Sequence, residues 1–443
     1  MAPDTEDHVN AGKRRIIPSF LWIVALLALR WTYHAFYLPV FEGPDEPFHL
    51  GRTIDAIEDG PLGFLASENE RLPRIVDEAI KHHPCAEDLA GEFNCPGFAG
   101  TEAFNILRRT RQEPTGGWVR NYEAHQPPLS YLIQAILTRL CPGSSDWTVE
   151  QLLLFCRILS VLYATAGTWL LFRTVEGRGS RWFLATLLLL PGAAEALIRC
   201  SNDSLLFLWT ALAISLLVSR HRGAALVATL SLGPLIKLTA FAIIGLALAR
   251  LWTEGRRRTF GIALMASLVV FPIQGLRGWL WGGTQEVNLA GGPLDEGTIS
   301  ILLGLLRSCY SMGKTAIWLG NWSFFRPPGW LVVLFGVFLL ALLVALRPRR
   351  DAIAGSVPHM VALLIAVVGT IVFAIGNRKL FGAWGGVGGW YLWGWFPWFA
   401  AAFNDSVCMR DKWEGWIRFS AVGLALMANL MWFREAFRLY GVT

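Results

Sequence analysis

The sequence predicts an all-α polytopic membrane protein. Of its 443 residues, 54% are hydrophobic and only 16% are charged, whereas soluble domains carry about 25% charged residues. The apolar residues form long segments, and the basic residues cluster in the gaps between them. This is the positive-inside pattern of membrane helices. The net charge of +6 therefore reflects membrane topology, and we do not expect nucleic acid as a partner.

The first predicted span covers residues 16–38. A helix of this length crosses about 30 Å of hydrocarbon at about 1.5 Å per residue. The segment is too long for the apolar part of a signal peptide, and no small-residue cleavage site follows it, so we expect it to remain as a transmembrane helix. The polar residues 1–15 are then cytoplasmic.

Residues 39–150 contain no further span and hold 18 of the 33 acidic residues. We expect them to form an extracytoplasmic loop domain with short amphipathic helices on the membrane surface. Cys85 and Cys95 lie in this domain. Outside the cytoplasm they can form a disulfide or remain two free thiols, and Cys141 can compete as a partner.

Residues 151–443 predict the remaining spans, which bring the total to about eleven. The predicted ranges are 152–174, 182–198, 205–218, 224–252, 260–280, 330–346, 357–375, a segment that ends near residue 402, and 416–431. An amphipathic outer stretch is expected at residues 298–325.

Residues 224–252 are predicted to form a hairpin of two short helices. Arginine clusters at 220–222 and 256–258 flank this segment, and both should be cytoplasmic. Lys237 then lies near the outer tip of the hairpin. Its side chain can reach the membrane interface, or it can hold an anionic headgroup or a phosphate.

This topology gathers polar side chains at the outer face, where a membrane helix meets water and an ionisable group suggests a function. The candidates are Asp45, Glu46, His49, His125, Gln126, Asn202, Asp203, Lys237, Arg307, Lys314, Arg378 and Lys379. For Asn202 and Asp203 the alternative is helix capping. For His125 and Gln126 it is a solvated turn at the interface.

Carboxylates beside cations suit transfer from an anionic, lipid-linked donor. One carboxylate can deprotonate an acceptor hydroxyl, and cations can hold a phosphate as its bond to the transferred group breaks. The sequence lacks a phosphate-binding glycine loop, a His-Glu-x-x-His zinc motif and a Gly-x-Ser-x-Gly elbow. The four histidines of residues 39–150 match no structural zinc spacing.

These residues resemble the GT-C superfamily of integral-membrane glycosyltransferases. The likeness is greatest to the bacterial branch related to protein O-mannosyltransferases and aminoarabinose lipid A transferases, and it extends to predicted membrane proteins of that type. The similar motifs, in chain order, are Pro44-Asp45-Glu46-Pro47-Phe48-His49, Gln126-Pro127-Pro128-Leu129-Ser130-Tyr131, Asn202-Asp203, Ile236-Lys237-Leu238-Thr239 and Gly389-Trp390-Tyr391-Leu392.

The resemblance implies a GT-C-like bundle with a large first outer loop and a polyprenyl-phosphate-sugar donor. The sugar would pass to a lipid, a cell-envelope glycan or a protein, with inversion, at the periplasmic face of a bacterial inner membrane. Asp45 would be the base, with Glu46 beside it, and Lys237 and outer arginines would engage the donor phosphate.

One position departs from the family pattern, because Trp390 stands where relatives carry an arginine. Arg378 and Lys379 are the candidates to replace that arginine, and Tyr391 keeps its place in the motif. Some GT-C enzymes hold a divalent metal at loop carboxylates, and Asp45 with Glu46 could do so. The sequence shows no second dedicated acidic pair, so the metal is left unassigned. No other cofactor is expected.

Two other classes of function remain open. A transporter or flippase of lipid-linked sugars would carry ionisable residues at mid-membrane in broken helices, and Pro234 is the feature that fits it. A degenerate, non-catalytic relative that serves as a scaffold would explain Trp390.

Overall fold

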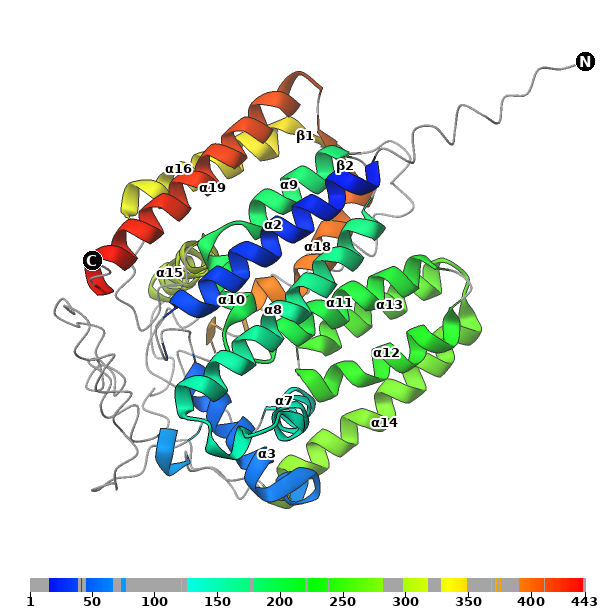
Figure 1. Cartoon of the computed structure of the whole chain (residues 1–443). Helices are drawn as coiled ribbons and strands as arrows, with labels where there is room; N and C mark the ends of the chain where they lie inside the picture. The colour runs from blue at the N-terminus through cyan, green and yellow to red at the C-terminus, as the bar shows by residue number, and fades with distance from the viewer. Residues whose placement is uncertain are drawn as a thin grey trace, which may run out of the picture.

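A computed structural model describes most of the chain. The described residues are 16–38, 41, 45–66, 73–76, 121, 126–175, 178–219, 222–237, 239–281, 298–317, 328–348, 368, 371–372, 374–375, 390–409 and 411–440. Within them the structure is almost entirely helical (Figure 1). This confirms the predicted all-α class. Cys85, Cys95 and the predicted span 357–375 lie wholly or largely outside the described residues.

The helices follow the predicted segments closely. In chain order they are α2 (Ile16–Tyr37), α3 (Glu46–Ala66), α7 (Leu129–Leu140), α8 (Val149–Thr174), α9 (Arg178–Leu188), α10 (Pro191–Ile198), α11 (Asp203–Val218), α12 (Gly223–Ile236), α13 (Ala240–Thr253), α14 (Arg257–Trp281), α15 (Thr298–Ile317), α16 (Gly329–Ala345), α18 (Trp390–Ser406) and α19 (Asp411–Tyr440). A short 3₁₀ turn, Ser144–Asp146, precedes α8. Two three-residue strands, β1 (Leu346–Pro348) and β2 (Val407–Met409), pair antiparallel.

Two helices in the described part of the chain are long and apolar enough to cross a membrane, Val149–Thr174 and Gly415–Arg434. The bent pair Arg181–Leu188 and Pro191–Ile198 makes a third if it counts as one span. Five shorter apolar helices accompany them, of which α11 is one. The chain thus has the character of a helical membrane protein, and the total of eleven spans stays a prediction.

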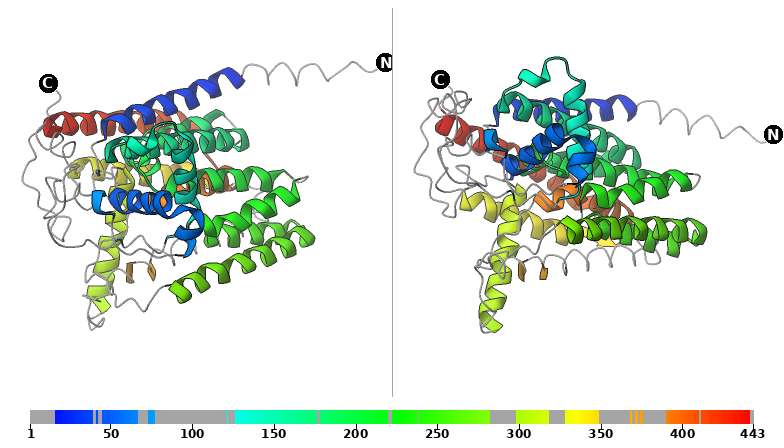
Figure 2. Two further views of the ribbon diagram at one scale, coloured as in Figure 1. Left: turned by 60° about the horizontal axis from the view of Figure 1, so that its bottom comes forward. Right: turned by 90° about the horizontal axis from the view of Figure 1, so that it is seen from below.

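Helix α8 lies at the centre of the bundle, where it packs against α11 and α2. Helices α3 and α7 lie at the end of the bundle where α2 ends and α8 begins (Figure 1). Most of the bundle helices run roughly along one direction, whereas α15 crosses them steeply (Figure 2). Residues from distant parts of the sequence therefore lie close together at the end of the bundle that α3 and α7 cover.

The predicted helix 182–198 is not continuous, and this prediction is wrong. The chain bends by 73° between α9 and α10, because Pro191 has no N–H to continue the helix and disfavours a helical residue before it. Asn429 donates from Nδ2 to the Leu189 carbonyl at 2.8 Å and so satisfies one carbonyl at the break. Helix α10 turns inward, and all eight of its residues are buried.

The predicted hairpin at residues 224–252 is confirmed as α12 and α13, with Lys237 directly after α12. Close packing against α11 holds it. A Cβ atom on Gly233 would lie 2.3 Å from the Trp209 ring, so only glycine fits there. The Trp209 indole also donates to the Thr229 carbonyl at 2.6 Å. The hairpin thus presents Lys237 to the N-terminal end of α11.

The inward turn of α10 gives a stability prediction. A Cβ atom on Gly192 would lie 2.4 Å from the Ala316 carbonyl oxygen of α15, so Gly192→Ala should destabilise the fold by about 1–3 kcal/mol through overpacking. Gly245 in α13 has no atom within 4 Å of the same position, and Gly245→Ala is the matched control. Thermal unfolding of the purified protein in detergent checks this. Equal melting temperatures for the two variants would contradict the packing of α10 against α15.

Candidate functional site

Glu46 begins α3 and is fully buried. Its carboxylate accepts two hydrogen bonds from Arg157 of α8, at 2.8 Å from Nε and 2.5 Å from Nη2. It also accepts the backbone N–H of Cys200 at 3.0 Å. A carboxylate held by a bidentate arginine and a backbone amide is fixed in place. These contacts favour a positioning role for Glu46 over the predicted catalytic one.

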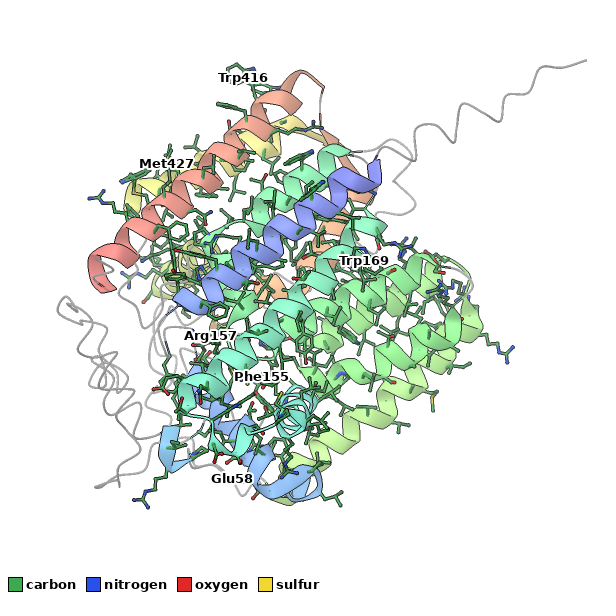
Figure 3. The ribbon with its side chains drawn as sticks, viewed as in Figure 1. Glu58, Phe155, Arg157, Trp169, Trp416 and Met427 are labelled. Atoms are coloured by element: carbon green, nitrogen blue, oxygen red, sulfur yellow. The ribbon has the colours of Figure 1, made fainter. Side chains whose placement is uncertain are left out.

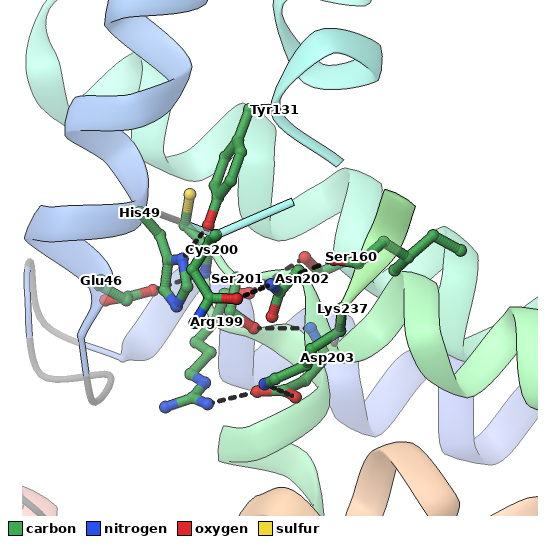
Figure 4. Close-up of polar contacts among 12 residues, drawn as sticks. Glu46, His49, Tyr131, Ser160, Arg199, Cys200, Ser201, Asn202, Asp203 and Lys237 are labelled. Atoms are coloured by element: carbon green, nitrogen blue, oxygen red, sulfur yellow. Dashed lines mark hydrogen bonds and ion pairs between the residues drawn. The ribbon is translucent and has the colours of Figure 1, made fainter. Parts of the chain in front are cut away.

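A second buried group of charges lies at the start of α11. Asp203 accepts from Arg199 at one oxygen and from Lys237 at the other, each at 2.5 Å (Figure 4). The Lys237 side chain is only 7% exposed. The alternative in which Lys237 reaches the membrane interface is therefore wrong, because its ammonium is directed into the protein toward Asp203.

These two groups are neighbours because Arg199 and Cys200 are consecutive residues. We call the five side chains the charged cluster: Glu46, Arg157, Arg199, Asp203 and Lys237. Its three cations face two carboxylates, so the cluster carries one excess positive charge. Excess positive charge in a poorly solvated place favours an anion, since Coulomb attraction is stronger there than in water.

Asn202 links the cluster to two other segments. Its Nδ2 donates to Gln126 at 3.1 Å and to the Ile236 carbonyl at 3.3 Å. The side chain makes no capping bond to α11, so the helix-cap alternative for Asn202 is wrong. The side-chain amide oxygen of Asn202, Oδ1, is buried and has no hydrogen-bond partner among the described residues. It is an acceptor that a substrate hydroxyl can use.

His49 connects α3 to α7. Its Nδ1 lies 2.7 Å from the hydroxyl of Tyr131, and the two rings stack. Burial, with the positive charges of Arg199 and Lys237, holds the pKa of His49 well below its ordinary value. The imidazole is therefore neutral at pH 7, and it lies near the cations Arg199 and Lys237.

Asp45 precedes α3 and is partly exposed. Its carbonyl accepts the N–H groups of Phe48 and His49, at 3.1 and 3.0 Å. Its φ of 62° is in the left-handed region, which is uncommon for residues other than glycine and is frequent at functional sites. Asp45 thus combines access to solvent with a fixed position at the edge of the buried charges.

The structure brings six predicted site residues together, namely Glu46, His49, Gln126, Asn202, Asp203 and Lys237. Asp45 directly precedes Glu46 in the chain. His125, Arg378 and Lys379 lie outside the described residues. Tyr391 follows Trp390 in the first turn of α18, and the described side chains do not include it. Arg307 lies on an exposed position of α15.

Sequence reasoning missed Arg157, Arg199 and Tyr131 as site residues. Figure 3 shows Arg157 of α8 toward the end covered by α3, far from Trp169 of the same helix. Arg157 is a charged residue inside a predicted apolar span, and such residues are rarely accidental. Arg199 lies three residues before the Asn202-Asp203 motif. Tyr131 belongs to the motif that follows Gln126.

An apolar cavity of about 600 Å³ lies between the α9–α10 break, α15, α16 and α18. Leu190, Ile317, Phe335 and Phe396 are among its lining residues, and so is Lys314. Its lining is almost wholly hydrophobic. A cavity of this kind suits a hydrocarbon chain with an anionic group at one end.

Asp45 and Glu46 are the two carboxylates at which the family resemblance allows a divalent metal. Among the residues that the structure describes, no group of three or more His, Cys, Asp or Glu side chains is arranged to hold a metal ion. Glu46 is also committed to Arg157. The donor set at this place therefore does not fit a divalent metal.

The lowered pKa of His49 predicts a pH dependence of stability. Below its ordinary pKa of 6.5 the unfolded chain binds a proton that the folded protein does not, so stability falls as the pH drops through that value. His49→Gln should remove this part of the slope. Tyr131→Phe, the control, should keep it, because His49 remains buried beside the cations. Melting temperatures from pH 8 to about pH 5 check this, and an unchanged slope in His49→Gln would contradict it.

The shared carboxylate predicts unequal costs within the charged cluster. Asp203→Asn removes the anion of both Arg199 and Lys237 and should cost about 3–5 kcal/mol. Lys237→Met should cost less, because Arg199 still pairs with Asp203. Adding Lys237→Met to Asp203→Asn should restore part of the loss. Thermal unfolding of the three variants measures the order, and a larger loss in Lys237→Met than in Asp203→Asn would refute it.

The comparisons with known proteins place this site within a family. The family described as "Predicted membrane protein (DUF2142)" matches residues 26–281. That range contains every residue of the charged cluster and all helices from α3 to α14. No curated protein matches the chain, and no solved structure matches it. Since the match covers more than half of the chain, the protein belongs to this family of predicted membrane proteins.

Proposed function

We propose that the protein is a membrane glycosyltransferase of GT-C type. It moves a sugar from a polyprenyl-phosphate-linked donor to an acceptor hydroxyl at the outer face of the membrane. The observation that carries the proposal is the placement of Asp45, a partly exposed carboxylate, directly before Glu46, whose side chain accepts the backbone N–H of Cys200. The residue before Cys200 is Arg199, which shares the carboxylate of Asp203 with Lys237. A base and an anion site are the two parts that such a transfer requires.

The reaction is a single displacement. Asp45 accepts the proton of the acceptor hydroxyl, whose oxygen attacks the anomeric carbon of the sugar. The bond between that carbon and the phosphate oxygen breaks, and polyprenyl phosphate leaves with both electrons. One displacement inverts the anomeric carbon. The charge that grows on the phosphate is stabilised by Arg199 and Lys237, which Asp203 holds side by side.

The apolar cavity is the proposed place of the lipid chain. Helix α10 joins the two regions, because Leu190 lines the cavity at its start and Arg199 belongs to the cluster at its end. Its eight residues span about 12 Å at about 1.5 Å per residue. Lys314 adds a cation to the cavity lining. A lipid phosphate thus has cations within reach while its chain stays in apolar surroundings.

The proposed acceptors are a lipid, a cell-envelope glycan or a protein, and the proposed location is a bacterial inner membrane with the site toward the periplasm. Helix α19 ends at the end of the bundle where α2 ends (Figure 1). That geometry agrees with an odd number of spans.

A second candidate function is transport or flipping of a lipid-linked sugar. The broken pair α9–α10 favours it, since transporters bind their substrates at interrupted helices. Glu195 of α10 is also buried, and it accepts the indole N–H of Trp432 at 2.5 Å. Proteoliposomes with a fluorescent lipid-linked sugar test this candidate, and transbilayer movement without transfer would favour it.

The central prediction concerns Asp45. Asp45→Asn keeps the shape of the side chain and removes the base, so turnover should fall by about 10²-fold or more. Asp59→Asn is the matched control, because Asp59 is an exposed aspartate of α3, the helix that Asp45 precedes. The measurement is sugar transfer by purified, reconstituted protein from a set of radiolabelled polyprenyl-phosphate sugars, with membrane extract as acceptor.

The results separate the candidate functions. Loss in Asp45→Asn together with normal turnover in Asp59→Asn supports the transferase. Equal turnover in all three proteins removes Asp45 from the mechanism. Absence of turnover in the wild type, with binding of the lipid donor, points instead to the non-catalytic scaffold.

A further inference from the structure

Arg157 contacts both sides of the connection between α2 and α3. Its Nη1 donates to the carbonyl of Leu38, at the end of α2, and lies 3.4 Å from the carbonyl of Ala35. Its Nε and Nη2 donate to the two carboxylate oxygens of Glu46. One buried guanidinium therefore holds the last turn of α2 and the first residue of α3 at the same time.

Asp45 lies immediately before the residue that Arg157 grips. Its left-handed φ of 62° costs free energy in a residue with a Cβ atom, and such a conformation persists only where surrounding contacts enforce it. Two kinds of contact surround Asp45. Glu46 is fixed by its side chain, and the Asp45 carbonyl is fixed by the N–H groups of Phe48 and His49.

We propose that Arg157 and Glu46 form a clamp that holds Asp45 in this conformation and so positions its carboxylate. The clamp itself does not depend on the proposed function, whereas its effect on catalysis rests on that function. Glu46 and Arg157 are positioning residues, because they act through Asp45. The sequence prediction of Glu46 as a second catalytic carboxylate is replaced by this role.

The clamp also sets the separation between the base and the phosphate-binding cations. Glu46 Oε1 accepts the N–H of Cys200, and the preceding residue is Arg199, which pairs with Asp203. The position of the base is thus tied through Glu46 to the backbone that carries one cation. A displacement of about 1 Å between reacting groups can cost about 10²-fold in rate, so this link has a kinetic consequence.

Lysine cannot replace Arg157 in this arrangement. The clamp uses three nitrogens of one planar group, and an ammonium on a flexible stem is a point charge without that fork. Arg157→Lys keeps the positive charge beside Glu46 and lowers the risk that the variant fails to fold. Glu46→Gln likewise keeps the shape of the side chain and an acceptor for the Cys200 N–H.

The first readout is amide hydrogen exchange of the purified full-length protein. In Arg157→Lys and Glu46→Gln, exchange of the Phe48 and His49 amides should rise about tenfold, as expected for loss of one charge-assisted hydrogen bond. Arg52→Lys is the matched control. Arg52 is equally buried, but its ion pair is with Asp55 of the same helix, so exchange at Phe48 and His49 should stay at the wild-type rate.

The second readout is sugar transfer. Both clamp variants should lose about 10²-fold in kcat with KM for the donor within about twofold, because the phosphate-binding cations are untouched. In Glu46→Gln the acid limb of the pH profile of kcat/KM should stay in place, since Asp45 remains the base. A general loss of structure would change KM and melting temperature together.

The outcomes test the clamp separately from the proposed function. Wild-type exchange in Arg157→Lys overturns the clamp whether or not the protein transfers sugar. Faster exchange with unchanged kcat overturns the positioning role. Loss of the acid limb in Glu46→Gln overturns it as well, because Glu46 would then be the base. If the wild type transfers no sugar, the proposed function fails, and exchange alone decides whether the clamp holds Asp45.

Discussion

The described structure depends on the pairing of charges inside an apolar bundle. A buried ion that loses its partner costs several kcal/mol, so each charge fixes the position of its counter-ion. Asp203 binds Arg199 at the end of α10 and Lys237 after α12. One carboxylate thereby determines where three segments meet. Apolar contacts add to this specification, because the close approach of Gly233 to the Trp209 ring also fixes the hairpin against α11.

At the break between α9 and α10, a polar contact again fixes the position of a segment. Pro191 ends α9, and Asn429 of α19 donates to the Leu189 carbonyl exposed by the break. The inward course of α10 then requires a small residue where it meets α15, and Gly192 supplies it. The bend therefore brings Arg199 to the charged cluster, and it requires close packing along the short helix α10.

Much of the fold could be predicted from the sequence, because long apolar segments leave few alternatives in a membrane protein. Residues 16–38 and the hairpin at 224–252 are examples. The break at Pro191 was missed, since the apolar run continues across it. At the site, the motifs located Asp45, Asn202 and Lys237, but they could not reveal which side chains these residues contact.

The roles of individual side chains were less predictable for a physical reason. Lys237 looks the same in sequence whether it meets water or a carboxylate 34 positions earlier in the chain. Glu46 follows Asp45 and was expected to share its chemistry, yet the helix start turns the two carboxylates to different surroundings. Neighbouring residues at a helix N-terminus diverge in this way because one belongs to the turn and the other to the helix.

The contact between Arg30 and Asn429 has a consequence for biosynthesis. The Arg30 guanidinium of α2 donates to the Asn429 side chain at 2.7 and 3.1 Å, across 399 positions of the sequence. At a synthesis rate of about 5–20 residues per second, α2 waits roughly 20–80 seconds for this partner. A cation in the first helix thus stays incompletely satisfied until the last helix is made. Chains that stop before residue 429 lack this hydrogen-bond acceptor for Arg30, so α2 cannot make its contact with α19 in them.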